Sequence, residues 1–383
     1  MKLKSNISDL FFDANYNQTY VKVCAPMVRY SKVQFRTLVK NFGVDLCFTP
    51  MILADSFCQN AKARTNEFVT TVSDTPLIVQ FAANNVDDFL DASTLVNPYA
   101  DGVDLNCGCP QRWAMKDGYG CALLSTPELV HDLLRSVRNK FPSTFSVSVK
   151  IRILQELKKT IAMCQQLEKC GINFMTVHGR TPMQKNGDNI DIETIRDICD
   201  IVKIPVIANG GVKTLDDADN LYKSTNCNGV MVAGGILNNP SLFSGTSKTP
   251  LACIKLWMDL KNSSTDKITF QCYHHHLVFM LDKVLSKKEK REFNNLSTFE
   301  SVDNFLYSKV INSYDYDISH DINITLDDFV TCQFDNQITT KHCSKCRGCG
   351  KSVCYCICSQ YDYNSTSDDG LDYMDSNIFN ESI

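Results

Sequence analysis

The sequence predicts an α/β protein built as a TIM (β/α)8 barrel, followed by a small all-α domain and an irregular tail. Between residues 21 and 245, short β-rich apolar runs alternate with longer segments whose apolar residues recur at helical spacing. Strands that alternate with helices indicate a parallel sheet. Eight such units follow one another, which is the number that closes a barrel. After residue 250 only helical patterns continue, so we expect a separate helical domain there.

The elements of the barrel are defined by the change between these two periodicities. The predicted strands are 21–24, 45–48, 77–81, 102–105, 145–150, 174–177, 206–208 and 229–232. The predicted helices are 32–41, 86–95, 127–140, 157–170, 192–201 and 215–223. An open, doubly wound sheet would show the same alternation and is the structural alternative.

The chain divides accordingly into four segments. These are an N-terminal extension at 1–20, the barrel at 21–245, the helical domain at 250–315 and the tail at 316–383. The helical domain shows helical spacing at 251–260, 269–283, 287–293 and 299–310. Within the tail, 332–358 is rich in cysteine. Residues 359–383 are acidic and poor in aliphatic side chains, which predicts disorder.

Composition and charge set bounds on the function. The net charge of −4 does not by itself indicate a protein that binds nucleic acid. The apolar runs are far shorter than the ~20 residues of a membrane span, and the N-terminus shows no secretory signal. Nineteen cysteines without such a signal predict a reducing compartment, the cytoplasm or the nucleus. We expect no obligate protein partner.

One turn is a candidate active site. Asn106, Cys107, Gly108, Cys109 and Pro110 directly follow the fourth predicted strand, and the carboxyl ends of the strands carry the chemistry in a TIM barrel. A thiol with an ordinary pKa of ~8.5 is mostly protonated at neutral pH. We therefore expect Cys109 to act as a proton donor, Asn106 to contact a base and Cys107 to pack in the core.

Other predicted strands end in side chains that suit a flat heteroaromatic ligand. Gln80 interrupts an apolar strand, and a buried amide needs hydrogen-bond partners. Lys150 also needs a partner, which either an anionic reduced flavin or a glutamate across the barrel could supply. His178 can donate to a carbonyl of the ligand, and Arg180 can bind a phosphate or a base. The candidate residues around the ring are Ala25, Pro26, Met27, Gln80, Lys150 and His178.

Paired glycines follow the seventh and eighth predicted strands. A TIM barrel binds phosphate at this place through backbone N–H groups. A phosphate there and a flat polar ring over the barrel centre together describe flavin mononucleotide (FMN). The residues expected to hold its phosphate side are Asn209, Gly210, Gly211, Ala233 and Gly234.

The sequence resembles the tRNA-dihydrouridine synthases, and within them the eukaryotic branch called dihydrouridine synthase 4. The resemblance extends from about residue 20 to about residue 310. Its most specific part is NCGCPQRWAM at 106–115. The other matching stretches are VCAPMVRYS at 23–31, LIVQFAAN at 77–84, VKIR at 149–152, VHGRT at 177–181 and IANG at 207–210.

This resemblance implies an FMN enzyme that reduces uridine in the D-loop of tRNA, at positions 20a and 20b, with NADPH as reductant. Hydride would pass from flavin N5 to uracil C6, and Cys109 would give a proton to C5. Asn106 would contact the uracil, and Arg180 would also serve the substrate. The helical domain would bind tRNA together with the barrel rim, through the basic run Lys283, Lys287, Lys288, Lys290 and Arg291. A solvated helix face is the simpler interpretation of that run.

The sequence departs from the family at one position of the phosphate site. Gly234 stands where the family usually has arginine, which predicts a weaker hold on the flavin phosphate because charge-assisted bonds are the stronger ones. Two other interpretations stay open. An FMN barrel that acts on a free pyrimidine would need no docking domain. A non-catalytic tRNA-binding relative would need neither Cys109 nor Lys150.

The cysteine-rich part of the tail has an incomplete metal signature. Cys343, Cys346 and Cys349 have the C-x-x-C spacing of a zinc half-site, but Cys354 opens a C-x-C-x-C run instead of a second one. The sequence therefore predicts no metal site. An incidental cysteine-rich segment is the simplest interpretation. The alternatives are a zinc site at Cys343, Cys346, Cys349 and Cys354, and redox pairing of the thiols.

Overall fold

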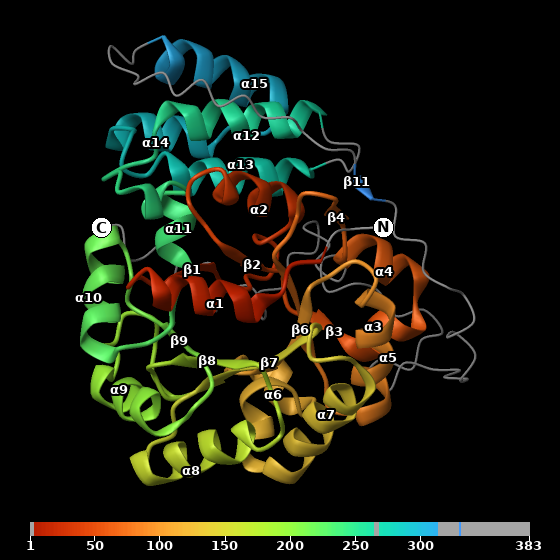
Figure 1. Ribbon diagram of the computed structural model, residues 1–383. Coiled ribbons are helices and arrows are strands. Elements are labelled where there is room, and N and C mark those ends of the chain that lie inside the picture. Colours follow the sequence, from red (N-terminus) through yellow and green to blue (C-terminus); the bar gives the residue numbers. More distant parts are fainter. Residues whose placement is uncertain (1–3, 264–267, 313–328, 331–383) are drawn as a thin grey trace.

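A closed parallel barrel forms the centre of the computed structural model, which describes residues 4–263, 268–312 and 329–330 (Figure 1). Its eight strands are β1 (Val21–Cys24), β2 (Leu46–Phe48), β5 (Leu77–Ala82), β6 (Gly102–Cys107), β7 (Ser146–Arg152), β8 (Phe174–His178), β9 (Val206–Asn209) and β10 (Gly229–Val232). Each strand pairs with the next in parallel, and β1 pairs with both β2 and β10. The predicted TIM barrel is therefore confirmed, and the open doubly wound sheet is wrong.

The barrel strands are buried along their length because helices cover the outside and side chains fill the inside. The covering helices are α2 (Val33–Lys40), α5 (Val86–Val96), α7 (Pro127–Lys140), α8 (Leu157–Glu168), α9 (Ile192–Ile201) and α10 (Leu215–Thr225). All six were predicted. Local sequence fixes their starts: Thr214 and Asp217 form a capping box on α10, and Pro127 is the first residue of α7.

Several short elements are additional to the prediction. After β2 the chain forms β3 (Ile52–Leu53), α3 (Ala54–Gln59), α4 (Ala61–Glu67) and β4 (Thr70–Thr71). After β6 it forms α6 (Arg112–Lys116) and a 3-10 helix, η1 (Gly120–Ser125). After β10 it forms α11 (Gly234–Asn238) and a second 3-10 helix, η2 (Leu242–Ser244). These elements are too short for hydrophobic periodicity to reveal them.

Helix α1 (Ile7–Tyr16) lies in the segment predicted only as an N-terminal extension. Ile7, Phe11 and Ala14 recur at helical spacing and are buried. The Phe11 ring lies 5.4 Å from the ring of Phe174, the first residue of β8. Helix α1 is therefore part of the barrel's hydrophobic core at the amino end of the strands.

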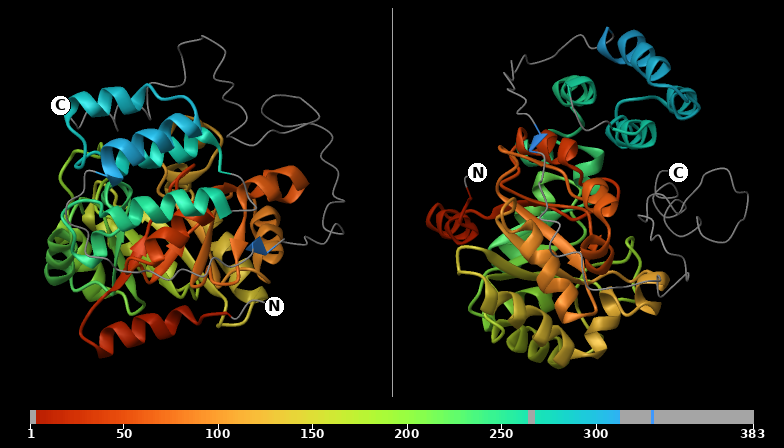
Figure 2. Two further views of the ribbon diagram at one scale, coloured as in Figure 1. Left: turned by 90° about the horizontal axis from the view of Figure 1, so that it is seen from above. Right: turned by 90° about the vertical axis from the view of Figure 1, so that its right-hand side faces the viewer.

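The last helices pack together on one side of the barrel (Figure 2). They are α12 (Leu251–Ser263), α13 (Phe270–Met280), α14 (Lys287–Asn294), α15 (Phe299–Phe305) and a π-helical turn, η3 (Leu306–Ile311). His276 of α13 joins them to the barrel, since its ring centroid lies 4.6 Å from those of Phe35 on α2 and Trp257 on α12. In the described part of the chain, no helix is long and apolar enough to cross a membrane.

Two residues of the predicted irregular tail have a regular structure. Strand β11 (Phe329–Val330) pairs antiparallel with β4, with Phe329 opposite Thr71. The other tail predictions lie outside the described residues. These are the cysteine-rich segment 332–358 with its alternative zinc ligands, and the acidic segment 359–383.

Candidate functional site

The side chains predicted for the site lie at the carboxyl ends of neighbouring strands. In the barrel register, Asn106 of β6 lies opposite Lys150 of β7. His178 of β8 lies opposite Arg152 of β7 on one side and Asn209 of β9 on the other. Residues far apart in the sequence therefore meet at one mouth of the barrel, because its parallel strands all end there.

Gln80 and Asn106 hold each other in a fixed orientation. Gln80 Nε2 donates to Asp104 Oδ2, and Asn106 Nδ2 donates to Gln80 Oε1, both at 2.8 Å. Asn106 Oδ1 accepts from the backbone N–H groups of Gly108 at 3.1 Å and Cys109 at 3.0 Å. Each amide nitrogen keeps one further N–H. The site therefore offers a bound ligand amide donors in set directions.

Cys109 is a protonated thiol at neutral pH. Burial raises its pKa above the ordinary value, while the charges of Arg152 and Lys150 act in the opposite direction. The residue is half-buried and, like Trp113, packs against a small buried cluster that includes Tyr119 and Ala114. A half-buried thiol that keeps its proton is suited to act as a general acid.

Gly120 and Arg152 hold the loop of Cys109 from two sides. Gly120 has a φ of +62°, and a Cβ there would lie 2.5 Å from the carbonyl oxygen of Cys109. Arg152 Nε donates to the carbonyl oxygen of Gly108 at 3.0 Å, and its Nη1 donates to that of Thr181 at 3.0 Å. This arginine therefore ties the loop after β6 to the loop after β8.

Positive charge is concentrated around His178. Burial and the neighbouring Arg152 lower the pKa of Lys150 to about 8. Burial and the charges of Lys150, Arg152 and Arg180 hold the pKa of His178 far below its usual range, so its ring is neutral. Arg180 Nη1 lies 3.2 Å from His178 Nε2. Since arginine only donates, Nε2 accepts and the ring proton is on Nδ1.

Lys150 has no salt bridge to a carboxylate among the residues that the structure describes. The glutamate across the barrel, which was one predicted partner, is therefore not found in this part of the chain. Together with Arg152 and Arg180, Lys150 makes the barrel mouth a place where a bound anion would be stabilised.

Glycines follow β9 and β10 at the place predicted for the phosphate. Gly210 and Gly211 have φ values of +122° and +75°, and a Cβ at Gly210 would lie 2.9 Å from His178 Cδ2. A Cβ at Gly234 would have no atom within 4 Å. Asn209 Nδ2 donates to the Met231 carbonyl at 2.8 Å and so joins the two strand ends. This arrangement fits the phosphate side of FMN, because exposed backbone can approach the phosphate oxygens.

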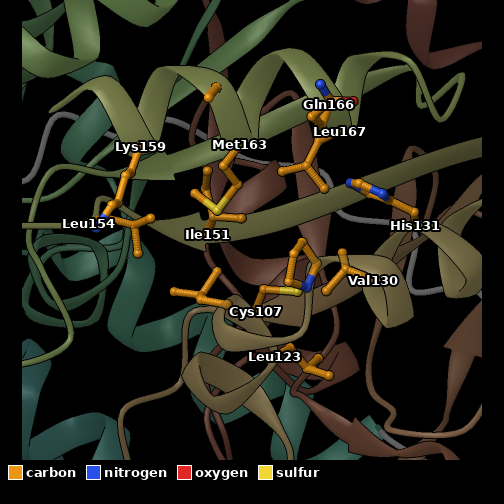
Figure 3. Close-up of a pocket in the computed structure, with 13 residues that line it drawn as sticks. Cys107, Leu123, Val130, His131, Ile151, Leu154, Lys159, Met163, Gln166 and Leu167 are labelled. Atoms are coloured by element: carbon orange, nitrogen blue, oxygen red, sulfur yellow. The ribbon is translucent and has the colours of Figure 1, made fainter. Parts of the chain in front are cut away.

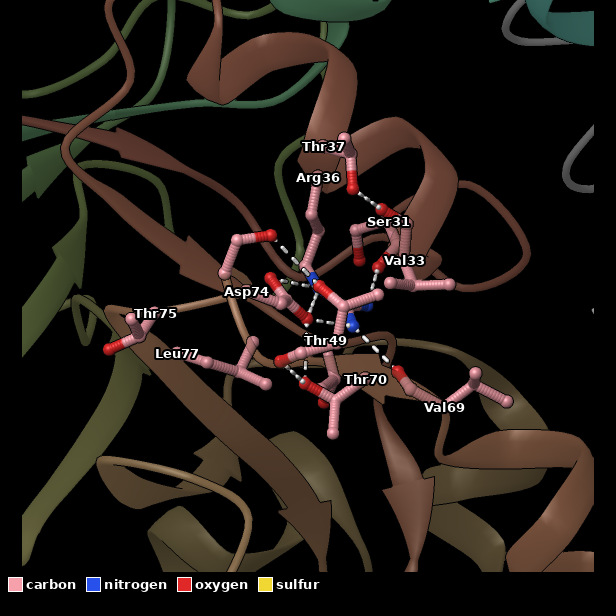
Figure 4. Close-up of polar contacts among 12 residues, drawn as sticks. Ser31, Val33, Arg36, Thr37, Thr49, Val69, Thr70, Asp74, Thr75 and Leu77 are labelled. Carbon is pink, nitrogen blue, oxygen red and sulfur yellow. Dashed lines mark hydrogen bonds and ion pairs between the residues drawn. The ribbon is translucent and has the colours of Figure 1, made fainter. Parts of the chain in front are cut away.

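The loop after β1 is held by a buried ion pair (Figure 4). Arg36 Nη2 lies 2.6 Å from Asp74 Oδ2, and Arg36 Nη1 donates to the Ser31 carbonyl at 2.7 Å. The Ser31 hydroxyl in turn accepts from the Met27 N–H at 3.0 Å. Ala25 and Met27 are buried there, and Pro26 is half-buried. The backbone that was predicted to face a flat ring therefore has a rigid support.

The side chain of Cys107, the last residue of β6, faces the covering helices and not the barrel mouth. Cys107 is fully buried. It lines a cavity of about 280 Å³ between the barrel wall and helices α7 and α8 (Figure 3). Ile151, Val130 and Met163 line the same cavity. Burial raises the pKa of Cys107 well above its ordinary value. These surroundings match the packing role predicted for this thiol.

The sequence interpretation assigned no role to three residues of the site. Asp104 lies two residues before Asn106 in a strand, so the two share a face, and this alternation was available as a signal. Arg152 lies in the matching stretch at 149–152. Gly120 follows the active-site turn by ten positions and had no signal in the sequence, because its importance comes from a contact with Cys109.

The comparisons with known proteins identify the family of this chain. The family model described as dihydrouridine synthase matches residues 23–305. This chain belongs to the dihydrouridine synthase family. It is 50% identical over 287 residues to a mouse protein named tRNA-dihydrouridine(20a/20b) synthase [NAD(P)+]-like, covering 75% of this chain and 88% of that one.

Two further relatives of this dihydrouridine synthase have similar names. A human protein with the same name as the mouse one is 48% identical, covering 75% of this chain and 90% of that one. The Schizosaccharomyces pombe tRNA-dihydrouridine(20a/20b) synthase [NAD(P)+] is 41% identical, covering 73% of this chain and 85% of that one. The part of the chain that matches the family model, residues 23–305, includes nearly all of the barrel and most of the helices after it.

Proposed function

We propose that this protein reduces uridine to 5,6-dihydrouridine at positions 20a and 20b of the tRNA D-loop, with FMN as cofactor and NADPH as reductant. The observation that carries the proposal is the protonated Cys109 thiol, held beside Asn106 at the cationic mouth of the barrel. The names of the relatives, which specify tRNA, positions 20a and 20b and NAD(P)+, support the substrate and the reductant.

The residues at the barrel mouth fit FMN. Ala25, Pro26 and Met27 would line the ring, while Gln80, Lys150 and His178 would bond its edge. Asn209, Gly210, Gly211, Ala233 and Gly234 would surround its phosphate. When bound and reduced by NADPH, FMN supplies the hydride that adds to uracil C6. Lys150 and its neighbouring arginines stabilise negative charge at this mouth.

Cys109 completes the reaction by general acid catalysis. Addition of hydride at C6 leaves negative charge on C5 and the C4 carbonyl of the uracil. The Cys109 Sγ–H bond breaks, its proton goes to C5, and the thiolate that remains is stabilised by Arg152 and Lys150. A remaining N–H of Asn106 can donate to a uracil carbonyl. The thiolate then recovers a proton from solvent.

The target uridine must leave its stack before its face can reach the barrel mouth, which costs a few kcal/mol. Contacts to the folded RNA must offset this cost. The exposed cations of this region are Lys283 before α14, Lys287 and Lys288 at its start, and Arg291 in its last turn. Lys290 is instead paired with Asp282 at 2.6 Å. We assign the exposed cations to the tRNA backbone and Arg180 to the substrate side of the site.

The test uses purified full-length protein, FMN, NADPH and tRNA from cells that lack this protein. Dihydrouridine is mapped by position, and the flavin that copurifies is measured by its visible absorbance. We expect dihydrouridine at positions 20a and 20b of the tRNA, and much slower turnover of free uridine. The Cys109→Ala variant should keep flavin and lose nearly all activity, while Cys107→Ala should stay near wild type.

Other outcomes would contradict the proposal. Turnover of free uridine as fast as tRNA would favour an enzyme of free pyrimidines. Protein that binds tRNA but neither holds flavin nor forms product would be a non-catalytic relative. Full activity of the Cys109→Ala variant would remove this thiol from the chemistry.

A further inference from the structure

A chain of hydrogen bonds runs from the barrel interior to the active-site loop. It begins at Ser148, whose hydroxyl donates to Asp104 Oδ1 at 2.7 Å. Asp104 Oδ2 accepts from Gln80, which accepts from Asn106, which accepts from the Cys109 N–H. Gln80, Asp104 and Ser148 lie side by side on β5, β6 and β7. This chain of hydrogen bonds therefore crosses three strands and ends at the backbone N–H of Cys109.

The direction of every bond in this chain follows from Asp104. An ionised carboxylate can only accept, so Gln80 must direct its NH2 group to Asp104 and its oxygen to Asn106. Asn106 must then donate to Gln80 and accept from the loop. With two backbone N–H groups bound to its oxygen, Asn106 has only an N–H left for a substrate. A carbonyl oxygen of a ligand can therefore accept a hydrogen bond from Asn106, whereas a ligand N–H finds no acceptor on this side chain.

We propose that Asp104 is a positioning residue of the reaction, which sets the orientation of the Gln80 and Asn106 amides and thereby the placement of Cys109. The inference rests on the proposed function, because it concerns the uracil carbonyl and the thiol that meets C5. Asp104 is fully buried, and its side-chain hydrogen bonds within the described residues are to Ser148 and Gln80. It acts through these neighbours and not by contact with tRNA.

Burial of an ionised Asp104 destabilises the folded protein. A residue with only a structural role would be expected to stabilise it, so this cost distinguishes the positioning role from a structural one. Burial raises its pKa to about 6 even though Ser148, Gln80 and Lys150 act in the opposite direction. The ionised form at neutral pH is therefore less stable in the folded chain than in water. A neutral side chain of the same shape should improve folding while it loses control of the amides.

The experiment compares Asp104→Asn with Asp101→Asn in the full-length, FMN-loaded protein. Asp101 is a matched control, because it is also fully buried and lies just before the amino end of β6. It accepts hydrogen bonds from Thr75 and from the backbone of Leu77, both away from the barrel mouth. An asparagine at 104 can either accept a hydrogen bond from Gln80 or donate one to it. The orientation of the Gln80 and Asn106 amides is then no longer fixed.

For Asp104→Asn we expect kcat to fall about tenfold or more, an unchanged KM for tRNA, and a melting temperature equal to or above that of wild type. For Asp101→Asn we expect a lower melting temperature with an unchanged kcat per flavin-loaded molecule. In flavin-free protein, alkylation of Cys109 by iodoacetamide should be faster in Asp104→Asn, because Asn106 no longer holds its loop. The modified peptide is identified by mass spectrometry.

The inference is overturned if Asp104→Asn melts below wild type and keeps its kcat, or if its alkylation rate equals that of the control. Asp104→Ser provides a second, smaller substitution should the asparagine variant not fold, with the same kcat and alkylation outcomes expected. Wild-type turnover of tRNA is measured first. Its absence refutes the proposed function, whereas normal wild-type turnover with a fully active Asp104 variant refutes only the positioning role.

Discussion

Arg152 Nε donates a hydrogen bond to the carbonyl oxygen of Gly108 at 3.0 Å, so a side chain at the end of β7 holds the loop that follows β6. Burial raises the pKa of Cys109, and the charge of the same guanidinium opposes this rise. One residue thus has both a geometric and an electrostatic effect on the candidate acid. These two effects can be separated by substitution.

Replacing Arg152 should impair Cys109 in two distinguishable ways. Arg152→Met removes both the bridge and the charge, so the pKa of Cys109 should rise further and kcat should fall about tenfold or more. Arg152→Lys keeps the charge but not the fork that reaches both carbonyls, so kcat should fall with a smaller rise in the pKa. The pKa is measured by the pH dependence of Cys109 alkylation. Equal alkylation profiles in wild type and Arg152→Met would refute the electrostatic part.

Gly120→Ala should disable the active-site loop, because a Cβ at this position collides with the Cys109 carbonyl oxygen and Cβ. We expect at least a tenfold loss of kcat, since misplacement of a catalytic group by about 1 Å costs roughly that much or more. Gly118→Ala is the matched control. Gly118 also has a positive φ, at +81°, but its nearest neighbour is the exposed Asn84 side chain at 3.5 Å. Steady-state kinetics that show equal losses in both variants would assign the effect to backbone strain alone.

Gly234→Arg should strengthen the binding of FMN. A side chain at Gly234 enters open space, and an arginine there would add a charge-assisted bond to the phosphate. We expect the Kd for FMN to fall about tenfold, measured by fluorescence titration of flavin-free protein. Asn238→Arg adds the same charge at an exposed position one turn farther along α11. An equal gain in this control would indicate a general effect of charge instead of a specific phosphate contact.

His276 should make the junction between the helices and the barrel sensitive to acid. Burial lowers its pKa from 6.5 to about 3, so the folded chain holds the ring neutral. The contribution of neutral His276 to the free energy of unfolding is complete above pH 6.5, the pKa of the group in the unfolded chain. It is lost as the pH falls below that value. Between pH 7 and pH 5 the wild type should lose about 2 kcal/mol that His276→Phe does not lose. Denaturant unfolding at both pH values measures the difference, and parallel losses in the two proteins would contradict it.

Much of the fold could be predicted because the barrel repeats one simple pattern. Strand β10 and helices α7 and α9 have the bounds that their apolar spacing indicated. Helix α1 was missed although Ile7, Phe11 and Ala14 show a helical period, since nothing before residue 20 indicated what they would cover. Strand β3 and helix α6 were missed because they are too short to show any period.

The sequence by itself determined the family, the barrel and the position of Cys109 at a strand end, because these depend on local motifs and on periodicity. Only the tertiary structure decided which partners the polar groups find. Gln80 and Asp104 are 24 residues apart, and Arg152 and Gly108 are 44 apart. Such pairs meet because the barrel register places their strands side by side. Burial at that mouth then decides which groups carry charge: the His178 ring is neutral, and the Cys109 thiol keeps its proton.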